Sequence, residues 1–285
     1  MTDKKVDYAK LKSGGAMRQR QENLFSMRLR VIGGQLTAEQ LRALADASEK
    51  YGKGEIHLTS RQGVEVSYVN IDDIDDFLAD LDKAGVHKGA CGPRTRTVIA
   101  CQGNLICPRG LIDAQDIAQK VDEKYFGAEA PGKFKISATG CPASCMKVQE
   151  NDFGIMGGVE PEWIEENCIH CGLCEKACRV DAIKLEEGTV KIDMDKCNLC
   201  SDCIFSCPTD AWVKAREGYT IYVGGKVGRK PKWGTEITQL VDEETLFDIL
   251  EKSFQFYRDN GSAGERFADT IEKVGIETFK DTVLP

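Results

Sequence analysis

The chain lacks long apolar runs, has few histidines and carries no excess of positive charge. No apolar stretch approaches the about 18 residues that a membrane-spanning helix needs. The first residues, Met1 to Asp7, lack the apolar core of a secretion signal. The formal net charge is −8, which argues against a general role in binding nucleic acid. We therefore expect a cytoplasmic protein that neither inserts into membranes nor binds nucleic acid.

Cysteine, in contrast, is abundant, with 13 in 285 residues. A chain of this length is expected to form about two domains with a sizeable core. A disulfide framework explains the cysteines poorly, because such frameworks are typical of short secreted chains. The thiols are therefore expected to bind metal.

Two cysteine runs of the type C-x2-C-x2-C-x3-C follow one another, and Pro208 closes the second. They are Cys168, Cys171, Cys174 and Cys178, then Cys197, Cys200, Cys203 and Cys207. This doubled run is the signature of bacterial two-cluster ferredoxins, in which the fourth cysteine of each run ligates the other cluster. It predicts one [4Fe–4S] cluster on Cys168, Cys171, Cys174 and Cys207, and another on Cys197, Cys200, Cys203 and Cys178. A pair of zinc sites is the alternative, but zinc sites seldom repeat this spacing twice.

A third tetrad precedes the doubled run. Cys101 and Cys107 form a C-x5-C pair, and Cys141 and Cys145 a C-x3-C pair. Twelve cysteines thus fall into three tetrads, each the right size for one cluster, which predicts a protein that moves electrons. Cys91 is left over, and we interpret it as a small buried thiol rather than a ligand.

The chain before the clusters predicts a small α+β plait. Residues 27–32 alternate as a strand, with Arg28 and Arg30 on one face, before Gly33 and Gly34. Thr37 opens a helix through a capping box, and the helix ends at Gly52. A hairpin of residues 55–59 and 64–69 follows, then a helix over residues 72–84.

Basic side chains gather near strand ends and turns of this region. Lys133 and Lys135 alternate with Phe134, so both leave the same face of a strand that leads to Cys141. A solvated basic face is the plainer reading of any single residue. Together, the basic residues predict a site for an anionic cofactor or an oxyanion. They are Arg28, Arg30, Arg61, Arg94, Arg96, Lys133 and Lys135.

The motifs resemble those of the sirohaem-dependent sulfite and nitrite reductases. The segment Met27 to Gly34 is similar to the first arginine strand of that family, and Leu58 to Gln62 to its Thr-x-Arg-Gln loop. Arg94-Thr95-Arg96, Gly132 to Lys135 and the two cysteine pairs resemble further family sites. The tail from Arg266-Phe267 to Lys280 resembles the family's Val-Gly-x-Glu-Thr-Phe segment, so the likeness covers most of the chain.

The resemblance implies roles for individual residues. Cys145 would be shared between a [4Fe–4S] cluster and the sirohaem iron, with Cys101, Cys107 and Cys141 as the other ligands. Arg28, Arg96, Lys133 and Lys135 would grip the oxyanion. Carboxylates of sirohaem would be bound by Arg61, Arg30 and Arg94, and by Lys226, Arg229 and Lys230 of a Gly-Gly loop. His57 stands where some relatives carry an arginine.

The resemblance also implies an architecture. It predicts one α+β sulfite/nitrite reductase half, made of a ferredoxin-like plait (residues 1–86) and an α/β sirohaem–cluster domain (87–160 and 217–285). A ferredoxin domain with two [4Fe–4S] clusters would be inserted at 161–216. Assimilatory relatives carry two halves in one chain, so a single half predicts a homodimer or a dimer of dimers.

The implied function is reduction of sulfite to sulfide with sirohaem and three [4Fe–4S] clusters. Electrons would come from a donor protein such as a ferredoxin or flavoprotein. Two alternatives stay open. The first is nitrite reduction to ammonia with the same cofactors. The second is an electron-transfer subunit without an active sirohaem of its own.

Overall fold

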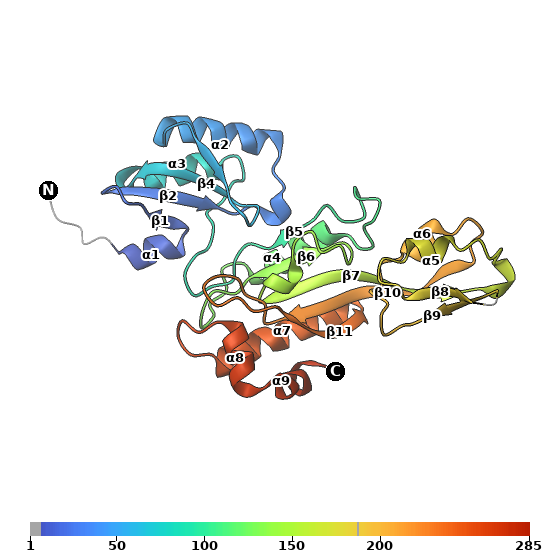
Figure 1. Cartoon of the computed structure of the whole chain (residues 1–285). Helices are drawn as coiled ribbons and strands as arrows, with labels where there is room; N and C mark the ends of the chain where they lie inside the picture. The colour runs from blue at the N-terminus through green and yellow to red at the C-terminus, as the bar shows by residue number, and fades with distance from the viewer. Residues whose placement is uncertain (1–6, 187) are drawn as a thin grey trace.

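The computed structural model describes residues 7–186 and 188–285, arranged around a four-stranded, a five-stranded and a two-stranded sheet (Figure 1). The fold is α+β, as predicted. Within the described ranges, no helix is both long and apolar enough to cross a membrane.

The N-terminal unit is an antiparallel sheet of strand order β1-β2-β4-β3, covered by helices. Its strands are β1 (Ala16–Arg18), β2 (Leu24–Leu29), β3 (Ile56–Leu58) and β4 (Val64–Asn70). Its helices are α1 (Tyr8–Ser13), α2 (Ala38–Tyr51) and α3 (Ile74–Asp82), with short turns η1 (Ile32–Gly34) and η2 (Ile71–Asp73). The core between sheet and helices includes Met27, Val66, Leu44, Phe77 and Leu81.

The elements predicted for this unit are present, but the first strand and the helix predicted over residues 72–84 differ in their bounds. In the capping box of α2, the Gln40 amide donates to Thr37 Oγ1 at 3.1 Å and the Thr37 amide to Gln40 Oε1 at 2.9 Å. The strand predicted over residues 27–32 is wrong in its bounds, because β2 ends at Leu29. Gly33 and Gly34 have φ of 56° and 73°, which turns the chain away from the sheet.

The central unit is a mixed sheet of order β11-β10-β7-β6-β5. Its strands are β5 (Ile99–Ala100), β6 (Ile136–Thr139), β7 (Phe153–Trp163), β10 (Trp212–Val223) and β11 (Thr235–Val241). β5, β6 and β7 run parallel, and β10 is antiparallel to both β7 and β11. The helices are α4 (Ala114–Tyr125), α7 (Glu243–Asn260), α8 (Phe267–Val274) and α9 (Ile276–Val283), with turn η3 (Val148–Glu150).

The core of the central unit is rich in aromatic rings. Tyr125 of α4 meets Phe254 of α7 edge to face, with ring centroids 5.8 Å apart. Phe134 contacts Phe254, Tyr257 and Phe267 at 5.2–5.8 Å. Such rings bury large apolar areas and add favourable edge contacts. The segment that carries Lys133 and Lys135 is thus anchored by a fully buried phenylalanine.

The long strands β7 and β10 project into a small third unit (Figure 1). It holds turn η4 (Glu165–Asn167), helices α5 (Leu173–Ala177) and α6 (Asp202–Ser206), and the hairpin of β8 (Ile183–Glu186) and β9 (Thr189–Ile192). Its buried apolar core includes Ile183, Val190, Cys203 and Trp212. We call this unit the insert, because β7 leads into it and β10 leads out.

Candidate active site and cluster sites

A hollow of about 290 Å³ lies between the N-terminal and central units. Five cations line it, together with the carboxylate of Glu65. The cations are Arg28 from β2, Arg61 from the turn before β4, Arg96 from the segment before β5, and Lys133 and Lys135 from the segment before β6. The structure thus brings all four predicted oxyanion-binding residues together with one predicted sirohaem-binding residue. We call this cavity the basic hollow.

Two arginines of the basic hollow are held by neighbours. Arg28 Nε donates to Glu65 Oε1 at 2.5 Å, and its other end approaches Cys91 Sγ at 3.6 Å. Arg96 donates to the carbonyl oxygens of Arg94 and Gly92, both at 2.8 Å. Cys91 is buried, as expected, and it also lines the hollow. Both guanidiniums are therefore oriented before any anion is bound.

The two lysines are poised differently. Lys133 is exposed and Lys135 is half-buried, while Phe134 between them is fully buried, as the alternation predicted. Burial lowers the pKa of Lys135 from 10.5 to about 8, and the charges of Arg61 and Arg266 act in the same direction. Burial also lowers the pKa of Lys133. An ammonium with a pKa near neutral pH is suited to donating a proton.

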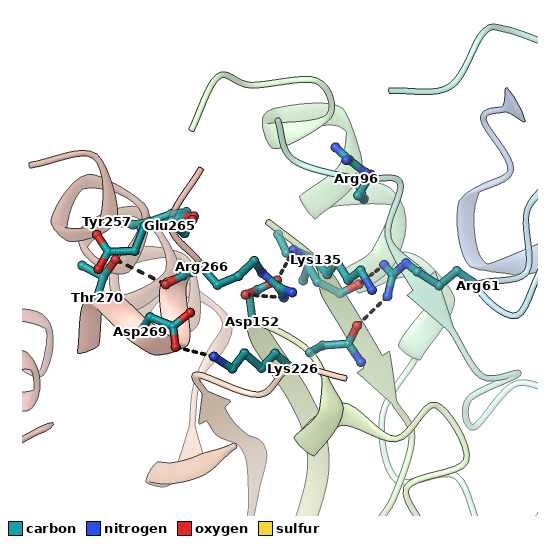
Figure 2. Close-up of polar contacts among 12 residues, drawn as sticks. Arg61, Arg96, Lys135, Asp152, Lys226, Tyr257, Glu265, Arg266, Asp269 and Thr270 are labelled. Atoms are coloured by element: carbon teal, nitrogen blue, oxygen red, sulfur yellow. Dashed lines mark hydrogen bonds and ion pairs between the residues drawn. The ribbon is translucent and has the colours of Figure 1, made fainter. Parts of the chain in front are cut away.

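A buried ion pair lies beside Lys135 of the basic hollow (Figure 2). The Asp152 carboxylate is fully buried and accepts from one nitrogen of Arg266 at 2.9 and 2.8 Å. It also accepts from the backbone amide of Lys135 at 3.0 Å. Arg61 donates to Asn151 at 2.5 Å and to two backbone carbonyls at 3.1 and 3.2 Å. Sequence reasoning assigned no role to Asp152; its place directly before β7 was the available signal.

A second cavity joins the basic hollow to Cys145. It shares Ser60, Arg61 and Lys135 with the hollow and is also lined by Cys145 and Val227. Val227 belongs to the Gly-Gly loop, so this loop reaches the second cavity. Cys145 is exposed. A large anionic ring bound across both cavities would thus meet cations on one side and a thiol on the other.

The other three cysteines of the third tetrad lie beside Cys145. The backbone amide of Gly140 donates to Cys101 Sγ at 3.0 Å. Burial raises the pKa of Cys141, and the nearby thiols Cys101, Cys145 and Cys107 act in the same direction. The donor set of four thiols with an amide directed at sulfur suits an iron–sulfur cluster, whose sulfur atoms accept such bonds.

In the insert, the cysteines group across the two runs. One pocket is lined by Cys168, Cys171, Cys174 and Cys207, with Trp212 at its wall. Burial raises the pKa of Cys200, to which the neighbouring Cys178 contributes, and that of Cys203 to about 12, to which Cys200 and Cys197 contribute. The groupings are those expected from crossed ligation. The cluster assignments themselves remain predictions.

Zinc is the alternative to clusters at these thiols. In the described part of the chain, no three His, Cys, Asp or Glu side chains come close enough to hold one ion. A zinc ion draws its four sulfurs to about 2.3 Å from one centre. A cube of four irons and four sulfides spreads its thiolates more widely.

Several predicted sirohaem-binding residues lie elsewhere. Arg30 pairs with the buried Asp122 at 2.6 Å and stacks on Phe126 at 4.3 Å. Arg94 pairs with Glu129 at 3.0 Å. Lys226 is buried and paired with Asp269 (Figure 2). Arg229 and Lys230 are exposed beyond the Gly-Gly loop. Binding of carboxylates by Arg30, Arg94 or Lys226 would require these ion pairs to open, and their roles stay predictions.

Comparisons with known proteins agree with this geometry. Residues 91–285 match the family described as "Nitrite and sulphite reductase 4Fe-4S domain". Residues 17–84 match the "Nitrite/Sulfite reductase ferredoxin-like half domain". The two matches meet between the N-terminal and central units, and the basic hollow lies at their junction.

The chain is also similar to individual proteins and solved structures that are named sulfite reductases. The chain is 32% identical over 272 residues to the coenzyme F420-dependent sulfite reductase of Methanocaldococcus jannaschii, covering 94% of this chain but only 44% of that protein. It is 28% identical over 278 residues to a subunit of the anaerobic sulfite reductase of Salmonella typhimurium, covering 90% of this chain and 82% of that relative. The crystal structure of dissimilatory sulfite reductase I has the same fold, with a TM-score of 0.76 at 20% identity over 91% of this chain and 69% of that chain.

Proposed function

The chain belongs to the nitrite and sulfite reductase family, and on this premise we propose that it is a sirohaem-dependent sulfite reductase. The observation that carries the proposal is the basic hollow, which opens onto Cys145. Five cations against one carboxylate are suited to a polycarboxylate ring and a small dianion. A merely solvated basic surface does not explain why these cations converge on one cavity.

We propose that the chain holds sirohaem and three [4Fe–4S] clusters. Cys145 would be shared between the first cluster and the sirohaem iron, with Cys101, Cys107 and Cys141 as its remaining ligands. The insert would hold the other two clusters. When bound, sirohaem and its cluster supply an iron centre that binds sulfite sulfur and delivers electrons to it. Arg61 would pair with sirohaem carboxylates from the wall shared by the two cavities.

The chain's own residues would then bind the anion and supply protons. Arg28 and Arg96 are oriented by Glu65, Cys91 and backbone carbonyls, so little ordering is required when an oxyanion arrives. Lys133 and Lys135 would stabilise the charge on its oxygens. Lys135, with its pKa near 8, is the better proton donor of the two. Bisulfite takes up six electrons and six protons to give hydrosulfide and three waters.

Nitrite is the rival substrate, because the matched family covers both anions. The single half with its insert favours sulfite, and the two curated relatives described above are named sulfite reductases. Relative turnover on sulfite and nitrite separates these readings. An electron-transfer subunit is the other rival, and the relative from Salmonella typhimurium is itself named as a subunit. Against it, the basic hollow retains all four predicted oxyanion-binding residues.

We further propose a cytoplasmic homodimer or dimer of dimers that receives electrons from a ferredoxin or flavoprotein. The proposed domain division is 1–86, then 87–160 with 217–285, and the insert at 161–216. The cations of one chain could serve its own sirohaem or that of a second copy. Mixing subunits that carry different inactive variants tests which of the two holds. Restored turnover in the mixture would show that they act across the dimer.

The deciding experiment is an anaerobic visible spectrum with iron, acid-labile sulfide and tetrapyrrole quantification. Sirohaem bands with about twelve cluster irons per chain are expected, at four irons for each cluster. About eight irons and no tetrapyrrole, after expression with ample sirohaem, would contradict the proposal and leave an electron carrier. Turnover on sulfite and nitrite, measured next on the same sample, identifies the preferred anion.

A further inference from the structure

Strand β7 lies against cysteine loops of both the central unit and the insert. A Cβ atom at Gly157 would come within 2.6 Å of the carbonyl oxygen of Gly140, the residue before Cys141. A Cβ at the next residue, Gly158, would lie 3.3 Å from the Cβ of Leu199, the residue before Cys200. The two loops therefore approach adjacent residues of β7. Two adjacent glycines make this close approach possible.

The register of β7 gives the order of the sites along it. The Val159 amide donates to the Leu199 carbonyl at 3.0 Å, and Val159 forms a bridge with Cys200. Trp163, four residues further on, pairs with Trp212. Trp212 lines the pocket of Cys168, Cys171, Cys174 and Cys207. Four residues of strand span about 13 Å, so the Cys200 site lies nearer to the Cys141 loop than this pocket does.

An ion pair makes a second link between the same two loops. Arg109 lies two residues after Cys107, and its guanidinium hydrogen-bonds the carboxylate of Asp202. Asp202 stands between Cys200 and Cys203 and is only 7% exposed. Arg179 adds a longer contact to this carboxylate at 3.8 Å. A buried carboxylate with two arginine neighbours ties the second cysteine run to the loop of the third tetrad.

The two runs differ at matching positions between their cysteines. Leu199 and Asp202 of the second run are buried, at 4% and 7% exposure. Their counterparts in the first run, His170 and Leu173, are exposed. Cys171 is exposed as well, and Ile169 is 61% exposed. The second run thus faces the central unit, whereas the first run faces solvent.

We propose that the two clusters of the insert act in a fixed series. The site of Cys178, Cys197, Cys200 and Cys203 is the inner relay, next to the third tetrad. The site of Cys168, Cys171, Cys174 and Cys207 is the outer relay, where electrons enter. Asp202, through Arg109, is a positioning residue that holds the inner relay against the central unit. The proposal rests on the proposed function for the presence of the clusters.

Each passage through the series moves one electron. An external one-electron reductant is oxidised once, and the outer relay is reduced. The outer relay is then reoxidised as the inner relay is reduced, and the inner relay in turn gives its electron to the third tetrad. Six passages supply the six electrons that bisulfite requires. Because tunnelling slows steeply with distance, the order set by β7 determines which cysteines lie on the last step.

The order is tested by electron paramagnetic resonance of the holoprotein reduced with titanium(III) citrate. Cys171→Ala removes the outer relay and Cys200→Ala the inner one, as iron quantification verifies. In Cys171→Ala the inner relay remains, and its signal should be broadened by the neighbouring reduced cluster of the third tetrad. In Cys200→Ala the outer relay remains, and its signal should be narrow because that cluster is more distant. The opposite pattern, or equal broadening in both variants, would overturn the series. Neither sulfite nor tetrapyrrole is needed, so a chain without sirohaem would refute the proposed function while the order is still measured.

A gentler variant covers the case in which loss of a cysteine unfolds the insert. Asp202→Asn keeps every ligand but removes the buried charge beside the inner relay. The midpoint potential of the inner relay should rise, because loss of a nearby negative charge favours reduction. The midpoint potential of the outer relay should stay unchanged within error. The matched control is Glu175→Gln in α5, which pairs with Lys184 at 3.6 Å beside the first run, and it should leave the inner potential unchanged. An unchanged inner potential in Asp202→Asn, or a shift confined to the outer relay, would contradict the assignment.

Discussion

The basic hollow and the insert differ in the residues that line them and in the size of the core that supports them. Cations line the hollow, close to a buried ion pair. The central unit that carries most of them has a large core of aromatic and aliphatic side chains. The insert has a small core, and one of its buried members is a cysteine. With the clusters proposed above, its stability should depend on them, as small metal domains generally depend on their metal. Substitutions in the hollow should thus separate function from folding, whereas substitutions of cysteines should not.

The largest effect is expected at Cys145, the thiol in the cavity next to the basic hollow. Cys145→Ser should abolish tetrapyrrole binding and sulfite turnover, and lower the cluster iron from about twelve to about eight per chain. The physical reason is that one thiolate serves two metal groups. Iron and tetrapyrrole quantification checks the outcome, with Cys91→Ser as the control for iron content alone, since Cys91 is expected to ligate no cluster. Full sirohaem content in Cys145→Ser would contradict the shared-ligand role.

A smaller effect is expected within the hollow itself. Lys133→Ala or Lys135→Ala should retain sirohaem and lower kcat for sulfite by about 10²–10³-fold, because charge stabilisation and proton donation are both weakened. Lys252→Ala is the control, since this half-buried lysine lies outside the hollow and pairs with Asp248 of its own helix α7. Near-normal turnover in both hollow variants would rule out the active-site assignment. Loss of sirohaem instead would move the lysines from catalysis to cofactor binding.

The buried carboxylate beside the hollow should behave as a structural group. Asp152→Ala leaves Arg266 buried without its partner, and loss of one member of such a pair costs about 3–5 kcal/mol. Denaturant unfolding measures this loss. Glu277→Ala removes an exposed carboxylate that pairs with Lys280, and it should cost about 0–1 kcal/mol. Equal losses in the two variants would show that the Asp152–Arg266 pair stabilises the fold no more than a surface pair does.

The smallest effect concerns pH and has opposite signs for activity and stability. Because burial lowers the pKa of Lys135 to about 8, kcat should fall as the pH rises through that value. The unfolded chain, with a lysine pKa of 10.5, binds the proton more tightly than the folded one. Between about 8 and 10.5 the contribution of Lys135 to stability should therefore rise with pH. Lys135→Met should remove both trends, and a kcat profile unchanged by this substitution would exclude Lys135 as the titrating group.

Sequence reasoning predicted local features better than distant pairings. The capping box at Thr37 and the alternation of Lys133 and Lys135 depend on neighbours in the chain, and both are present. Arg30 and Lys226 find their carboxylates 92 and 43 residues away, which no local pattern reveals. Asp152 escaped notice for the same reason, since a lone aspartate before a strand has no distinctive spacing.

The cysteine runs are an exception, because here the sequence predicted which distant residues lie together. Their groupings across the two runs were predicted from spacing alone, because several ligands on one tight loop leave little freedom for the rest. The strand ending at Leu29 shows the contrary case. Its alternation continued to Ile32 in the sequence, but Gly33 and Gly34 turned the chain earlier than the pattern indicated.

The flanking of the insert by β7 and β10 has a consequence for biosynthesis. These strands pair over most of their length, from Phe153 with Val223 to Trp163 with Trp212. The ribosome releases β7 first, then the insert, and only later β10, β11 and the closing helices. The central sheet thus stays incomplete, with an open edge on β7, until the insert has been synthesised. An insert that failed to fold around the proposed clusters would leave β10 badly placed to pair with β7, and the open edge of β7 would be a target for chaperones and proteases.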